Sequence, residues 1–285
     1  MSKIAIVTDS TAALPQEALS GFPVFVVPLQ VIWGEKTYRD SVDIQPNEFY
    51  EKLAHADVMP TTSQPSPAAF HEIYSRLLDE GHEILSIHIS SKLSGTIDSA
   101  IQAKQMLEGA PIEIVDSEAT SMALGFQVLN AIQVLRQGAT LKEAKEKVEN
   151  ARSRTCVYFV VDTLEFLHRG GRIGGGSAFL GTLLNLKPLL ALRNGRVEAV
   201  ERVRTMSKAV NRLLDLVEKD IDGSKNVQFC AIHANAEELA DIVRERVCER
   251  FGLPDKNKVM IAGVSPVVGT HAGPGTVGLS YFISE

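Results

Sequence analysis

The feature that most restricts the fold of this chain is a regular alternation of strand-like and helix-like segments along its first half. Short apolar runs typical of buried strands occur at residues 4–8, 24–31, 84–89 and 112–115. Apolar residues recur instead at helical spacing at residues 49–56, 67–80, 96–107 and 119–137. Alternating strands and helices favour parallel strand pairing, with helices on both faces of the sheet. The first half therefore predicts an α/β fold built on a parallel sheet.

Hydroxyl and carboxyl side chains gather where three of these predicted strands end. The sequence reads TDST at 8–11, SSKLSGT at 90–96 and VDS at 115–117. In open α/β sheets, ligands bind outside the carboxyl ends of the strands. We therefore expect the three clusters to converge on one edge of the sheet and to mark a ligand site.

The second half of the chain predicts a separate domain with a mixed sheet. An amphipathic helix at 141–152 is expected to bridge the two halves. Asn194-Gly195 lies between two short apolar runs, which is a hairpin signal and predicts antiparallel pairing. Because 285 residues are many for one compact domain, we expect two. The predicted boundaries are 1–154 for an N-terminal α/β domain and 155–285 for a smaller C-terminal α/β domain.

Charge and cysteine content narrow the classes of partner. The formal net charge of -6 argues against nucleic acid, whose protein partners carry clustered positive charge. The three cysteines lie far apart without a CxxC pair, which favours a reducing compartment and free thiols over a metal site. The first residues enter a strand-like run directly, and no apolar stretch approaches transmembrane length. We expect a cytoplasmic protein without a metal.

Two hydroxyl-rich segments offer both helix caps and ligand donors. In TTSQPSP at 61–67, Ser66 before a proline is a typical N-cap, whereas Thr62 and Ser63 lie outside that cap and are free for another role. SSKLSGT follows a predicted strand and precedes a helix, so its hydroxyls and backbone N–H groups suit an anion. Gly95 would let the backbone approach closely. Capping of the helix by Ser94 is an equally good interpretation.

A single histidine lies in a segment that is rich in glycine and proline, GVSPVVGTHAGPG at 263–275. Most single histidines are structural. His271 has few bulky neighbours in this segment, so a ligand role and an incidental one remain open alternatives.

A glycine-rich segment, HRGGRIGGG at 168–176, places Arg169 and Arg172 beside five glycines. Glycines allow backbone amides to cradle a phosphate, and arginine pairs with one through two hydrogen bonds. The spacing matches neither GxxxxGK[ST] nor GxGxxG, so a nucleotide site has weak support. A flexible loop with solvated arginines is the alternative interpretation.

Taken in order, these motifs resemble the DegV family. The resemblance runs through TDST, TTSQPSP, SSKLSGT and VDS, then LHRGGRIG at 167–174, LKP at 186–188 and GTHAGPG at 269–275. It covers essentially the whole chain, and the ordered set is more specific than any single motif. Ala272 stands where many members carry threonine, which changes neither His271 nor the glycines.

The resemblance implies a Rossmann-like N-terminal domain, a smaller α/β C-terminal domain and a bound long-chain fatty acid such as palmitate. It implies that Thr62 and Ser94 hold the ligand carboxylate, with His271 close by. The residues that would lie near the head group are Ser63, Gly95, Thr96 and Thr270. No cofactor is implied.

The resemblance further implies a partner, because some relatives are the fatty-acid-binding subunit of a bacterial fatty acid kinase. That kinase phosphorylates the bound carboxylate, and by position Arg169, Arg172 and Arg202 would serve it. A guanidinium deep beside an acyl chain is costly to desolvate, so Arg169 and Arg172 are expected at the pocket mouth or on the surface. This implies a non-enzymatic role in lipid transport or fatty acid metabolism.

Other functions remain as alternatives. Ser94 with His271 would suit a lipid hydrolase, but Ser94 lies in KLSGT and lacks the first glycine of the GxSxG elbow. The glycine-rich segment would suit phosphoryl transfer. A structural or regulatory protein with an incidental lipid is the third possibility. For a fatty acid, the candidate tail-lining runs are residues 87–89, 178–186 and 189–192, each of which also suits ordinary core.

Overall fold

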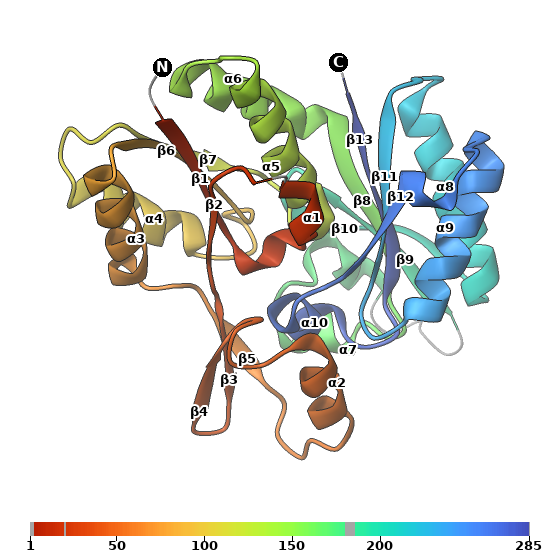
Figure 1. Cartoon of the computed structure of the whole chain (residues 1–285). Helices are drawn as coiled ribbons and strands as arrows, with labels where there is room; N and C mark the ends of the chain where they lie inside the picture. Colours follow the sequence, from red (N-terminus) through yellow and green to blue (C-terminus); the bar gives the residue numbers. More distant parts are fainter. Residues whose placement is uncertain (1–2, 20, 180–185, 285) are drawn as a thin grey trace.

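The computed structural model describes residues 3–19, 21–179 and 186–284. Within these residues the strands form three sheets (Figure 1). The first is fully parallel, with the order β2-β1-β6-β7. Its strands are β1 (Lys3–Asp9), β2 (Val24–Val27), β6 (His82–His88) and β7 (Ile112–Asp116). The parallel sheet predicted for the first half is confirmed.

Helices cover both faces of this sheet, as predicted. One face carries α3 (Pro67–Asp79) and α4 (Thr96–Gln105), and the other carries α5 (Ser121–Arg136) and α6 (Leu141–Ala151). Strand residues alternate between the two cores: Ala5 and Val7 join the cluster under α3, whereas Ile6 joins the cluster under α5. This alternation follows from the two-residue period of a strand.

A second, three-stranded antiparallel sheet was not predicted. Its order is β4-β3-β5, from β3 (Gln30–Trp33), β4 (Lys36–Arg39) and β5 (Thr61–Ser63), and α2 (Pro46–Ala54) lies between β4 and β5 in sequence. The apolar run at 24–31 is therefore two strands in different sheets. Pro28, which has no N–H to donate, separates them and suits a break in strand pairing.

The second half forms a six-stranded mixed sheet, in the order β10-β9-β8-β13-β11-β12. The strands are β8 (Thr155–Val160), β9 (Lys187–Arg193), β10 (Arg196–Val203), β11 (Val227–His233), β12 (Val259–Gly263) and β13 (Val277–Ile283). Asn194 and Gly195 both have positive φ and join β9 to β10, so the predicted hairpin is confirmed.

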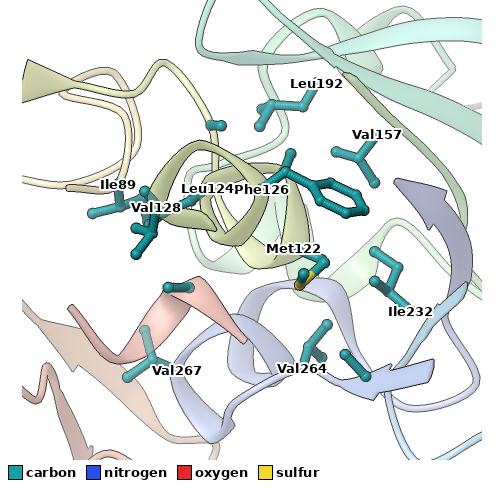
Figure 2. Close-up of a cluster of buried hydrophobic side chains, with 14 of the residues drawn as sticks. Ile89, Met122, Leu124, Phe126, Val128, Val157, Leu192, Ile232, Val264 and Val267 are labelled. Atoms are coloured by element: carbon teal, nitrogen blue, oxygen red, sulfur yellow. The ribbon is translucent and has the colours of Figure 1, made fainter. Parts of the chain in front are cut away.

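Helix α5 lies between the two large sheets. The outer face of the six-stranded sheet is covered by α8 (Met206–Ile221) and α9 (Glu237–Phe251), and its inner face contacts α5 from the first half (Figure 1). Figure 2 shows Met122, Phe126 and neighbouring apolar side chains of α5 among residues of both halves. We propose that the domains meet at 154/155, just before β8 begins, with α5 as their shared core helix.

The remaining short elements include η1 (Ser10–Ala12), α1 (Gln16–Leu19), η2 (Arg152–Arg154), α7 (Glu165–Arg169), η3 (Gly174–Phe179), η4 (Lys256–Lys258) and α10 (Pro266–Ala272). In the described part of the chain, none of the helices has the length and apolar character needed to span a membrane.

Candidate functional site

A cavity with mostly apolar walls lies where the first half meets the six-stranded sheet. Its apolar lining comprises Leu29, Ile89, Leu93, Val157, Phe159, Leu167, Leu192, Val197, Ile232, Val264, Val267, Val268 and Ala272. Its polar lining comprises Thr62, Ser63, Gln64, Ser94, Thr120, Ser121, Arg172, His271 and Thr276. Of the predicted tail-lining runs, Ile89 and Leu192 line the cavity, whereas residues 180–185 lie outside the described residues. The cavity is therefore an apolar space with a few placed polar groups, as small-molecule sites commonly are.

Thr62 and His271 meet in this cavity although they lie 209 positions apart. The Thr62 hydroxyl and His271 Nε2 are 2.7 Å apart, at hydrogen-bonding distance. Thr62 belongs to β5, which is fixed by pairing with Val31 of β3. His271 belongs to α10, so the glycine- and proline-rich segment at 263–275 is helical at residues 266–272. Pro266 occupies the first turn, where proline is favoured, and Gly273 with positive φ follows the last residue.

His271 is partly buried, and its ring is neutral at pH 7. Burial, and to a smaller extent the nearby Arg172 charge, lowers the pKa of His271 to about 4. A Cβ placed on Gly170 would lie 2.0 Å from Nδ1, so only glycine fits beside the ring. Nδ1 has no hydrogen-bond partner among the described residues. An unpaired buried acceptor is tolerated better than an unpaired N–H, which favours the tautomer with hydrogen on Nε2. Nε2 then donates to Thr62, and the Thr62 hydroxyl hydrogen is available to a ligand.

Ser94 lines the same cavity. Its hydroxyl lies 2.8 Å from that of Thr96, which is buried. The N-cap of α4 is Gly95, so the alternative interpretation of Ser94 as the capping residue is wrong. A Cβ on Gly95 would lie 3.1 Å from the Gln64 amide nitrogen. The SGT turn and the TSQ strand end therefore pack against each other, which brings Ser94 to the cavity that Thr62 lines.

The three arginines lie in different environments. Arg172 lines the cavity, where Nε donates to the Leu93 carbonyl at 3.0 Å and Nη1 to the Gly170 carbonyl at 2.7 Å. Arg169 is exposed and forms an ion pair with Glu165 at 2.5 Å. Arg202 is exposed, with its guanidinium 5.0 Å from the centre of the Phe179 ring. The glycine-rich segment is thus ordered as α7, a turn and η3, and Arg172 lies in the cavity wall while Arg169 lies outside it.

The other residues predicted near the head group also differ in whether they lie at the cavity. Ser63 lines the cavity, and Gly95 and Thr96 belong to the turn that carries Ser94. Thr270 points elsewhere, because its hydroxyl donates to the Pro266 carbonyl within α10 at 2.8 Å. Thr120, Ser121 and Gln64 also line the cavity and were not predicted; the first two follow the VDS cluster at the end of β7, which was the available signal.

The TDST cluster holds the protein together instead of lining the cavity. Ser10 donates to Asp40 at 2.6 Å and accepts from the Leu29 N–H at 3.0 Å. The Asp40 carboxylate also accepts from the Val267 N–H, in the first turn of α10, at 3.1 Å. Burial raises the pKa of Asp40 to about 6. Asp40 therefore fixes the start of the helix that carries His271.

Comparison with known proteins supplies the family. The family model described as "Uncharacterised protein, DegV family" matches residues 3–284. A DegV domain-containing protein of Halalkalibacterium halodurans is 40% identical over 290 residues, covering 100% of both chains. A solved structure described as fatty acid binding of a DegV family protein from Thermus thermophilus is 41% identical with a TM-score of 0.93, covering 100% of both chains. DegV of Bacillus subtilis, described as a fatty acid binding protein, is 33% identical with a TM-score of 0.87, again over 100% of both chains. The chain therefore belongs to the DegV family.

Proposed function

We propose that this protein binds a long-chain fatty acid such as palmitate, with the carboxylate at Thr62, Ser94 and His271 and the acyl chain along the apolar walls of the cavity. The observation that carries this proposal is the Thr62–His271 pair, which presents a hydroxyl donor at one polar patch of an otherwise apolar space. The fatty acid binding described for the relatives from Thermus thermophilus and Bacillus subtilis supports the same ligand class.

The chemistry of the polar patch suits an anion. The hydroxyls of Thr62 and Ser94 can donate to carboxylate oxygens, and the Arg172 charge lowers the energy of a negative group beside neutral His271. Hydrogen bonds to a charged acceptor contribute about 1.5–3 kcal/mol each. A C16 chain has about 14 methylenes, whose burial is favourable by about 11 kcal/mol before the cost of association. The tail thus supplies most of the affinity, and the hydroxyls fix which end is held.

We propose that the fatty acid is cargo and not a substrate of this chain. A serine nucleophile needs its base within hydrogen-bonding reach. The Ser94 hydroxyl pairs with Thr96, and His271 Nε2 pairs with Thr62, so each is engaged elsewhere. The sequence around Ser94 lacks the GxSxG elbow, and the described residues contain no group of three or more metal-type ligands. We expect the isolated chain to hydrolyse neither esters nor ATP.

We further propose that the protein acts in the cytoplasm in lipid transport or fatty acid metabolism, and that it presents the carboxylate to a fatty acid kinase. Arg169 and Arg202 are exposed and suit contact with such a partner, whereas Arg172 suits the head group. Changing Arg169 and Arg202 to alanine should weaken kinase binding and leave palmitate affinity within about twofold, because neither lines the cavity.

Native mass spectrometry of the purified protein tests the ligand, and palmitate titration tests the residues. We expect a co-purifying fatty acid, and about tenfold weaker palmitate binding in both Thr62→Val and Ser94→Ala. An empty protein that also fails to bind added palmitate would contradict the proposal. Full palmitate affinity in both variants would contradict the assigned head-group site.

A further inference from the structure

The cavity wall contains two hydroxyl-bearing residues that the proposed head-group site does not use. Thr120 and Ser121 line it at the N-terminus of α5. Ser121 is only 2% exposed. Across the described ranges 3–19, 21–179 and 186–284, neither the Thr120 Oγ1 nor the Ser121 Oγ has a hydrogen-bond partner. A buried hydroxyl without a partner is costly, so both groups are candidates for a ligand contact.

The local backbone shows that these hydroxyls are not used as ordinary helix caps. Thr120 is the N-cap residue of α5, yet its side chain makes no capping bond. Thr140 and Thr205 hold the same position in α6 and α8, and both accept from the third residue of their helix. Ser121 has φ 53°, in the left-handed region that non-glycine residues rarely adopt. The start of α5 is thus an unusual backbone, and it places two residues with unpaired hydroxyls in the cavity wall.

The chemistry at this point suits a neutral oxygen. Ile89 and Val157 line the same cavity and offer no hydrogen bond, so a polar group on an acyl chain would be unpaired against them. At the start of α5, hydroxyls and the positive end of the helix dipole favour oxygen lone pairs. The arginine of the lining, Arg172, lies beside His271 and binds two carbonyls, so a second carboxylate would lack a dedicated cation here.

We propose that Thr120 and Ser121 form a second hydrogen-bonding site in the cavity, which takes a hydroxyl or keto oxygen on the acyl chain. The protein would then accept oxygenated fatty acids as well as plain ones, and the position of the oxygen along the chain would decide which isomer fits. This inference rests on the proposed function, because it requires that the carboxylate is held at Thr62, Ser94 and His271.

The test is a matrix of dissociation constants for palmitate and for C16 acids that carry one hydroxyl at different carbons. The proteins are the wild type, Thr120→Val, Ser121→Ala and, as a head-group comparison, Ser94→Ala. Valine replaces the threonine hydroxyl with a methyl group of similar size, and alanine removes the serine hydroxyl while keeping Cβ, so each change eliminates one hydrogen-bonding group.

We expect at least one hydroxy isomer to bind the wild type within a few-fold of palmitate. That isomer should lose about tenfold in Thr120→Val or Ser121→Ala, while palmitate binds these variants as well as or better than the wild type. Ser94→Ala should weaken all ligands alike. The inference is overturned if every hydroxy isomer binds far more weakly than palmitate, or if the two variants weaken palmitate as much as the hydroxy acids. Failure of the wild type to bind any of the acids would refute the proposed function itself.

Discussion

Gly170→Ala offers the sharpest test of the Thr62–His271 pair, because it perturbs the pair without touching either residue. Gly170 has φ -75°, which alanine adopts freely, so the backbone accepts the change. The new Cβ, however, would lie 2.0 Å from His271 Nδ1, where ordinary contacts begin at 3.4 Å. The ring must therefore retreat by about 1.4 Å, the difference between these two distances.

That displacement is large compared with the tolerance of a hydrogen bond. The Thr62–His271 distance is 2.7 Å, and a separation of about 3.6 Å is no longer a hydrogen bond. Thr62 cannot simply follow the ring, since β5 is paired with β3. Loss of the oriented donor to a carboxylate costs about 1.5–3 kcal/mol, which corresponds to about 10- to 100-fold weaker palmitate binding.

The assay is isothermal titration with palmitate, with thermal unfolding as a check on folding. Gly171→Ala is the matched control: Gly171 has φ 68° and open space around its would-be Cβ, so alanine costs about 1–2 kcal/mol of stability but leaves His271 in place. Adding Thr62→Val to Gly170→Ala should cost less than Thr62→Val does alone, since both disable one pair. Wild-type affinity in Gly170→Ala, or equal losses in both glycine variants, would refute the reasoning.

Three further predictions concern charge. The pKa of His271 is lowered from 6.5 to about 4. As pH falls, this histidine therefore binds a proton in the unfolded chain at a higher pH than in the folded chain. The free energy of unfolding should therefore drop by about 3 kcal/mol from pH 6.5 to pH 4, and His271→Gln should remove this dependence in urea titrations. The pKa of Asp40 is raised from 3.8 to about 6, so its contribution has the opposite sign: stability falls by about 3 kcal/mol as pH rises through that range, and Asp40→Asn should remove that loss. If the free energy of unfolding depends on pH in both variants as it does in the wild type, other groups set the pH dependence. Arg172→Gln should weaken palmitate binding by about tenfold at low salt, whereas Arg169→Gln should have less than a twofold effect; equal effects would contradict their separate placement.

Local sequence patterns were sufficient to predict the elements whose structure is set by residues close together in the sequence. The parallel sheet followed from alternating periods, the β9–β10 hairpin from Asn194-Gly195, and the α3 N-cap from Ser66, whose hydroxyl accepts from the Ala69 N–H. The three-stranded sheet had no such signal. Its strands have three or four residues, and β5 contains only hydroxyl side chains, so no period can be read. Its pairing is set by tertiary contacts.

The same division applies to the candidate site. Thr62, Ser94 and His271, which line one cavity, could be singled out from the sequence, because two lie in hydroxyl-rich segments and one lies among glycines. The position of Arg172 in the cavity wall could not be predicted from the sequence. It depends on the close contact between the turn at Gly170 and the His271 ring. Asp40 gave no signal either: its partners Ser10 and Val267 lie 30 and 227 positions away. Residues that position a site through long-range contacts leave no local pattern.

Because of these long-range contacts, the polar end of the cavity forms only when the two halves of the chain are packed together. Helix α10 is held at its start by Asp40, at its middle by Tyr50, whose hydroxyl would lie 2.4 Å from a Cβ on Gly269, and at its end by Thr62. All three residues belong to the first half, whereas α10 belongs to the second. A ligand that contacts both Thr62 and His271 binds only when the halves are docked, so its binding free energy adds to the stability of that docked state. The site therefore needs no separate lid residue to couple ligand binding to domain contact, since the pair that would hold the carboxylate is itself a contact between the halves.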